Sequence, residues 1–198
     1  CWEPKGEIAL KLLHKNLREL QTDYVDLVFI HSIGSDKMDF RTVFGSGGCY
    51  AAMMKAKTRG MTRLVGLSGH NRPARFTKAL RNFQVDVLLN AINFVDRHTY
   101  KFEETVWPLA HRLKVGLIGM KVFGGQDKSE NTKLSHSFMS AEYHDLAFRY
   151  ALSIPGIASA AVGMASRAEL YQNIKRAQTL KPITPLEARR IKKIGKRL

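Results

Sequence analysis

Cysteine is scarce in this chain, with only two among 198 residues. Cys1 and Cys49 form neither a C-x-x-C pair nor a zinc-ligand spacing, which excludes a disulfide-stapled secreted scaffold and a zinc finger. No apolar run approaches the roughly 20 residues that a transmembrane helix needs, and the first residues do not make a signal peptide. These absences predict a protein without a membrane partner, in a reducing, cytoplasmic setting.

Acidic residues are also few, since 17 Asp and Glu stand against 32 Lys and Arg, for a net charge of +15. The basic residues are dispersed except in the tail "RRIKKIGKRL" at 189–198, and no RNA-binding signature is present. We therefore do not expect a nucleic-acid partner, although a basic polyanion-binding protein remains a third hypothesis. The ordinary proportions of hydrophobic residues, 44%, and charged residues, 25%, predict one globular domain over 1–198.

The apolar pattern alternates between helices and strands. Strands are predicted near residues 24, 64, 86, 115 and 158, and helices over 7–20, 50–60, 72–83, 101–114 and 140–153. Pro108 should kink or divide the fourth of these helices. Two further helices are predicted from capping boxes, Ser166 with Glu169 and Thr184 with Glu187.

Alternation of this kind predicts an α/β fold with a parallel sheet, either a doubly wound open sheet or a (β/α)₈ barrel. Ligands gather at the carboxyl ends of the strands in both architectures. His31 ends the first strand, "YVDLVFIH", and other candidate residues follow later strands: Ser68, Met120, Lys121 and Gly163. An isolated histidine at a strand end can equally be a hydrogen-bonded structural residue.

Four segments together resemble the aldo-keto reductase family, in order and in register from about residue 7 to the last helix. They are "LRELQTDYVDLVFIH", "MTRLVGLSGHN", "VGLIGMKVFGG" and "YALSIPGIASAAVGMASRAELYQNI". The resemblance implies a (β/α)₈ barrel that binds NADP(H), or alternatively NAD(H), and reduces a small carbonyl compound to an alcohol. It also implies a histidine that orients the carbonyl oxygen, and His31 matches that histidine.

The resemblance further implies contacts to the nicotinamide half of the cofactor. Ser68 matches the serine that bonds the carboxamide, although Gly69 stands where the family often has asparagine. Asn90 corresponds to the family's amide residue on the next strand, with Asn93 as the competitor. Met120 takes the place of an aromatic ring that many members stack on the nicotinamide.

The adenosine half would bind near the last strand and the helix that follows. Lys121 is expected to contact a phosphate or the backbone, with amine chemistry as a less favoured alternative. Gly163 and Met164 lead into a helix whose free N–H groups could bind the phosphate, with Arg167 as the cation for a 2′-phosphate and with Gln172 and Asn173 facing the adenine. The alternative for "SRAE" is a helix cap and nothing more. The family's basic residue is absent at Gly163, so NADP over NAD is only a preference.

The family's proton-donating tyrosine, its aspartate and its lysine precede the segment with which this chain begins. About five β/α units are present, and five strands do not close a barrel of eight. We therefore expect the C-terminal part of a reductase barrel that is inactive by itself. The alternative is a non-catalytic fragment that binds a nucleotide or a partner, and no motif specifies the substrate or an oligomeric state.

Overall fold

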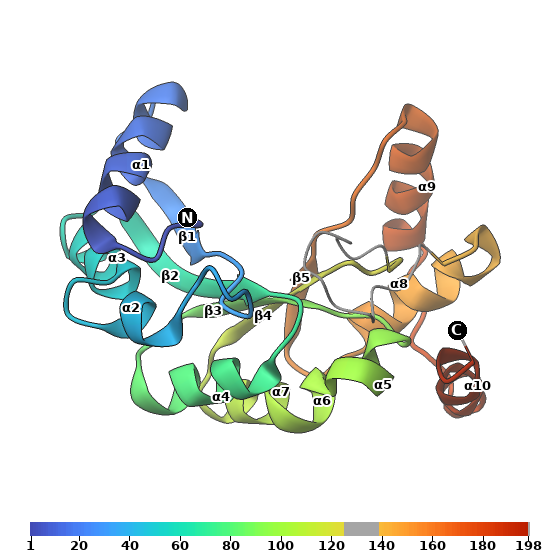
Figure 1. The fold of residues 1–198 in the computed structure, drawn as a ribbon. Helices are drawn as coiled ribbons and strands as arrows, with labels where there is room; N and C mark the ends of the chain where they lie inside the picture. The colour runs from blue at the N-terminus through green and yellow to red at the C-terminus, as the bar shows by residue number, and fades with distance from the viewer. Residues whose placement is uncertain (125–138, 198) are drawn as a thin grey trace. The chain divides into compact units, whose positions relative to one another are not determined.

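The computed structural model describes residues 1–124 and 139–197, in which helices alternate with parallel strands. The strands are β1 (Val25–Ile30), β2 (Thr62–Gly69), β3 (Val87–Ala91), β4 (Gly116–Met120) and β5 (Ile157–Ala160). They form one five-stranded sheet in chain order, β1-β2-β3-β4-β5, and β1 with β2 and β4 with β5 are parallel pairs (Figure 1). The predicted α/β fold with a parallel sheet is confirmed.

The helices lie between and after the strands. They are α1 (Gly6–Glu19), α2 (Phe40–Phe44), α3 (Cys49–Thr58), α4 (Pro73–Asn82), α5 (Asp96–Tyr100), α6 (Phe102–Thr105), α7 (Trp107–Arg112), the 3₁₀ turn η2 (Ala141–Tyr143), α8 (His144–Leu152), α9 (Arg167–Gln178) and α10 (Pro185–Gly195). None of the helices in the described ranges is long and apolar enough to span a membrane.

The chain divides into two compact units, so the single domain over 1–198 stays a prediction. Unit 1 comprises Cys1–Leu89 and Thr105–Gly116. Within it, α1 packs on α3, and α3 packs on β1 and β2 (Figure 1). Helix α1 buries Ala9, Leu13 and Leu17, which lie four residues apart and therefore share one face of the helix.

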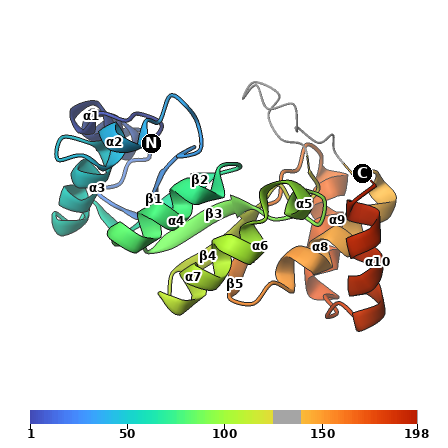
Figure 2. The same cartoon turned by 60° about the horizontal axis from the view of Figure 1, so that its bottom comes forward.

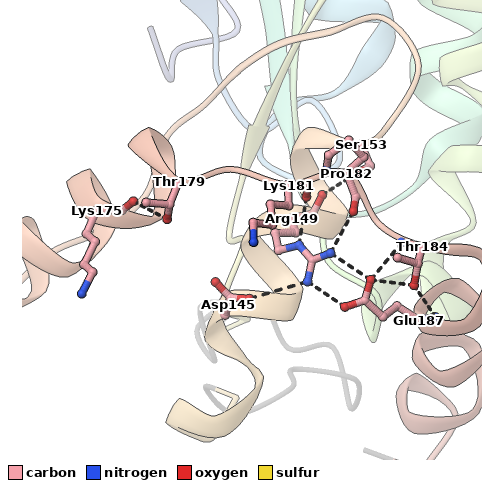
Figure 3. Close-up of polar contacts among 9 residues, drawn as sticks. All are labelled: Asp145, Arg149, Ser153, Lys175, Thr179, Lys181, Pro182, Thr184 and Glu187. Atoms are coloured by element: carbon pink, nitrogen blue, oxygen red, sulfur yellow. Dashed lines mark hydrogen bonds and ion pairs between the residues drawn. The ribbon is translucent and has the colours of Figure 1, made fainter.

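Unit 2 comprises Asn90–Glu104 and Leu117–Leu198, and Figure 2 shows its helices α8, α9 and α10 from a second side. Arg149 on α8 holds the segment that leads into α10 (Figure 3). Its Nε donates to the Lys181 carbonyl at 2.9 Å, its Nη2 donates to the Pro182 carbonyl at 2.8 Å, and its guanidinium pairs with both carboxylate oxygens of Glu187 at 2.7 and 2.8 Å. These bonds fix where α10 begins.

Helix ends largely follow the predicted chemistry. The helix expected over 101–114 is divided into α6 and α7 at Pro108, which sits in the first turn of α7. The capping box at Thr184 is complete. The box at Ser166 is not, which corrects the prediction: Ser166 Oγ accepts from Glu169 N, but the Glu169 carboxylate bonds Ala165 N rather than the cap residue itself.

Two short helices were not predicted. Helix α2 lies between β1 and α3, and α5 comes after β3, in stretches for which no helix was predicted. Asp39 caps α2, because its Oδ2 accepts from Thr42 N at 2.9 Å. Each helix has five residues, too few for an apolar period to be visible.

Candidate functional site

His31 and Ser68 meet at the carboxyl ends of β1 and β2 in unit 1. Strand β1 pairs with β2 so that Ile30 lies opposite Leu67, and the next residue on each strand is therefore His31 and Ser68. His31 Nδ1 and Ser68 Oγ lie 2.8 Å apart, which is a hydrogen bond. Two residues that the sequence placed at the carboxyl ends of strands are thus in direct contact.

The environment of His31 favours the neutral form of its ring. Burial lowers the pKa of His31, because a charged imidazolium is poorly solvated there. The Trp2 ring stands edge-on to the His31 ring, with 6.1 Å between the centroids. Ser68 is fully buried, so its hydroxyl needs a hydrogen-bond partner, and His31 supplies one. The residue after His31, Ser32, has a left-handed φ of 55°.

Two asparagines compete for a cofactor role at the end of β3, in unit 2. The Asn93 amide forms hydrogen bonds with the residues that follow it: its oxygen accepts from Val95 N at 3.0 Å and from Asp96 N at 2.8 Å. Its nitrogen donates to Asp96 Oδ2 at 2.5 Å and to the Lys121 carbonyl at 3.0 Å. Asn90 lies inside β3 and is 1% exposed. The hydrogen bonds of Asn93 therefore hold the backbone between β3 and α5 and the end of β4, and Asn90 stays the proposed cofactor contact on the basis of the resemblance.

Unit 2 also contains a pocket of about 690 Å³. Residues after β4, before and at the start of α8, after β5 and along α9 line it. Five of the predicted cofactor residues are among them: Lys121, Gly163, Met164, Gln172 and Asn173. Four others are not: Ser68, which belongs to unit 1, Asn90, Met120 and Arg167, the last of which is exposed at the start of α9.

Four pocket residues were missed as ligand contacts by the sequence analysis: Phe123, His144, Glu169 and Arg176. The Phe123 and His144 rings stack with 4.3 Å between their centroids, and the Arg176 guanidinium lies 5.8 Å from the Phe123 centroid. Arg176 Nη1 also donates to Asn173 Oδ1 at 2.9 Å. Of these four residues, only Glu169 belongs to a recognisable sequence motif, and that motif predicted a helix cap rather than a ligand contact.

Lys121 directly follows β4 and lines the pocket. Its φ is 55°, a left-handed conformation that a side chain other than glycine rarely adopts. The Asn93 amide holds its carbonyl at 3.0 Å. Backbone of this kind persists where surrounding bonds over-determine it, and such places often serve a ligand.

The aldo/keto reductase family model matches residues 5–145, well over half of the chain. The chain belongs to the aldo/keto reductase family. No curated protein matches it at a significant level.

Solved structures of aldo-keto reductases match the fold. One is an aldo-keto reductase from Bacillus halodurans in its holo form, with a TM-score of 0.72 and 20% identity over 97% of this chain and 68% of that one. Another is an aldo-keto reductase from Bombyx mori in complex with NADP, with a TM-score of 0.68 and 18% identity over 98% of this chain and 65% of that one. The fold is therefore that of the (β/α)₈ barrel, incomplete here, with five parallel strands over about two thirds of these relatives' length.

Proposed function

We propose that this chain is the cofactor- and carbonyl-binding part of an NAD(P)H-dependent oxidoreductase that reduces an aldehyde or ketone to an alcohol. The observation that carries the proposal is the His31–Ser68 hydrogen bond at the ends of two neighbouring strands, in a chain of this family. Carboxyl ends of barrel strands are where barrel enzymes place their reactive groups.

The pocket of unit 2 fits the adenosine and phosphate part of a nicotinamide dinucleotide. Its volume is in the range of ordinary ligand pockets. Its cations, Lys121 and Arg176, suit phosphate oxygens, and the amides of Gln172 and Asn173 suit the polar edge of adenine. The dinucleotide, when bound, supplies the hydride for the carbonyl carbon.

His31 would act on the carbonyl oxygen. Because its pKa is lowered by burial, the ring is neutral at pH 7 and carries one proton. If Ser68 Oγ donates to Nδ1 across the 2.8 Å bond, that proton sits on Nε2. Nε2–H can then donate to the carbonyl oxygen and stabilise the negative charge that develops there.

Ser68 would serve a second partner at the same time. A hydroxyl that donates to His31 still has acceptor lone pairs, so its oxygen can accept from the carboxamide N–H₂ of the nicotinamide. For unit 2, the resemblance proposes Asn90 as an amide contact of the cofactor and Met120 as the side chain that covers a face of the nicotinamide ring. Each role follows the resemblance of the strand ends to the family.

Proton donation would require the tyrosine, aspartate and lysine that the resemblance predicts and that these 198 residues do not include. The isolated chain should therefore bind the dinucleotide without turning over a carbonyl substrate. Cys1 Sγ and Cys49 Sγ lie 3.7 Å apart as free thiols, and a reducing, cytoplasmic setting is part of the proposal.

The test is to titrate the 198-residue chain with NADH and NADPH and to follow the nicotinamide fluorescence, with consumption of the dinucleotide measured in the presence of an aldehyde. Ser68→Ala should weaken binding about fivefold, the equivalent of one hydrogen bond of about 1 kcal/mol, whereas the exposed control Ser153→Ala should not. The proposal would be contradicted if neither NADH nor NADPH bound, or if turnover of the aldehyde survived His31→Ala.

A further inference from the structure

The start of α9 carries a negative charge where a phosphate would have to bind. Glu169, in the first turn of this helix, lines the pocket. Its Oε2 accepts from Ala165 N at 2.7 Å, and its own N–H donates to Ser166 Oγ at 3.2 Å. Two amides that an incoming anion could have used are thus already paired by the chain itself.

Among the described residues on α9 and in the segment after β5, no cation lines the same end of the pocket. Arg167 does not line it, and Gly163, which does, has no side chain. The pocket arginine, Arg176, comes seven residues after Glu169, which is about 10 Å further along the helix axis. Its guanidinium faces Phe123 and Asn173. Arg176, one of the two cations of the pocket, therefore lies away from the start of α9.

We infer that Glu169 makes this pocket select an adenosine with a free ribose 2′-hydroxyl, hence NAD(H), and reject a 2′-phosphate, hence NADP(H). The inference rests on the proposed dinucleotide-binding function. A carboxylate accepts hydrogen bonds from ribose hydroxyls, whereas it repels the doubly charged 2′-phosphate.

The free oxygen of Glu169 is the selective atom. Among the residues that the structure describes, Glu169 Oε1 has no hydrogen-bond partner, so it can accept from a hydroxyl at no cost to the helix cap. The side chain is exposed, so salt screens the repulsion. Selectivity should therefore be largest at low ionic strength.

Gly163 offers a way to reverse the selection. A Cβ built at this glycine meets no atom of the described residues within 4 Å, and its φ lies outside the left-handed range. A lysine side chain can therefore be added there without displacing a neighbour. Gly163→Lys combined with Glu169→Gln removes the negative charge and supplies a cation at the same end of the pocket.

The experiment is to measure dissociation constants of NADH and NADPH at low salt for the wild-type chain, Glu169→Gln, Gly163→Lys with Glu169→Gln, and the charge-matched control Glu19→Gln on α1. Circular dichroism checks that each variant is folded. The wild type should bind NADH about fivefold more tightly or better, which corresponds to about 1 kcal/mol. Glu169→Gln should narrow that ratio to within about twofold by improving NADPH, the double variant should favour NADPH, and Glu19→Gln should leave the ratio unchanged.

The variant Arg176→Gln tests whether Arg176 contacts the pyrophosphate or the 2′-phosphate. Loss of a pyrophosphate contact weakens both dinucleotides equally, as we expect, whereas a selective loss of NADPH would assign the 2′-phosphate to Arg176 and overturn the inference. Equal or tighter NADPH binding by the wild type, or an unchanged ratio in Glu169→Gln, would also overturn it while leaving the proposed function standing. Failure of both dinucleotides to bind would overturn the proposed function and the inference together.

Discussion

Replacing Asp86 by alanine should loosen the sheet of unit 1 at the end opposite to His31 and Ser68. Asp86 precedes β3, and its Oδ2 accepts two bonds: from Lys57 Nζ at 2.6 Å and from Val65 N at 2.7 Å. Its own amide donates to the Val65 carbonyl at 3.0 Å. One carboxylate thus joins α3, β2 and the entry to β3.

The expected cost follows from these bonds. The Asp86 and Lys57 side chains are 18% and 26% exposed, so their attraction is less screened than at the surface. Asp86→Ala loses that pair and leaves the buried Val65 amide without an acceptor, which together should cost about 3 kcal/mol of unfolding free energy. Asp86→Asn keeps an oxygen for Val65 N and loses only the ion pair, so it should cost about 1.5 kcal/mol.

Urea unfolding gives the free energies, and hydrogen exchange of the Val65 amide reports the bond directly. Combining Asp86→Asn with Lys57→Met isolates the ion pair, and we expect a coupling energy of about 1 kcal/mol. Equal unfolding free energies for Asp86→Ala and Asp86→Asn, with unchanged exchange at Val65, would refute the role of this carboxylate in capping the strand.

Three further predictions concern other groups. Burial lowers the pKa of His31 from 6.5, so His31 binds a proton more tightly in the unfolded chain than in the folded one. The unfolding free energy should therefore fall as the pH drops below about 6.5. Urea midpoints measured against pH should show this fall, and His31→Gln should reduce it. Burial raises the pKa of Cys49 to about 11, so iodoacetamide at about pH 8 should label it at least about tenfold more slowly in the folded chain than in urea, and equal rates would contradict this. Gly195→Ala gains about 1 kcal/mol of helix propensity, but its Cβ would lie 2.2 Å from the Phe94 carbonyl oxygen; exchange of the α10 amides should therefore accelerate, and slower exchange would mean that propensity dominates.

The elements that could be predicted from sequence are those whose cause is local. Helix α1 has a long apolar stripe, and Pro108 divides α6 from α7 because it removes a backbone donor wherever it stands. Thr184 and Glu187 complete their capping box within four residues. None of these features depends on a partner elsewhere in the chain.

Helix α2 shows where local reasoning ends. Phe44 lies 4.5 Å from Phe83 and 5.4 Å from Tyr50, ring centroid to ring centroid. These rings come from α2, α3 and the end of α4, and their packing stabilises a helix that is too short to form alone. Aromatic residues in a glycine-containing stretch carry no period that reveals such a cluster.

The candidate site divides in the same way. His31 and Ser68 could be predicted to meet, because parallel strands carry their carboxyl ends to one edge and both residues end a recognisable strand. The pocket of unit 2 could be placed near Gly163 for the same reason, but the stack of Phe123, His144 and Arg176 could not be predicted. Their chain positions are far apart, and no motif links them.

The segment 166–169 forms a helix cap, and this cap limits which part of a nucleotide the proposed pocket could bind there. As a helix cap, Glu169 must turn its carboxylate back toward the start of α9, where it bonds Ala165 N. As part of a nucleotide pocket, the same start of the helix would attract a phosphate through its free N–H groups. Because the cap places the negative charge where that phosphate would bind, the feature that stabilises α9 also removes the reason to expect a 2′-phosphate there. A ribose hydroxyl, which donates rather than accepts, is the ligand group that satisfies both demands.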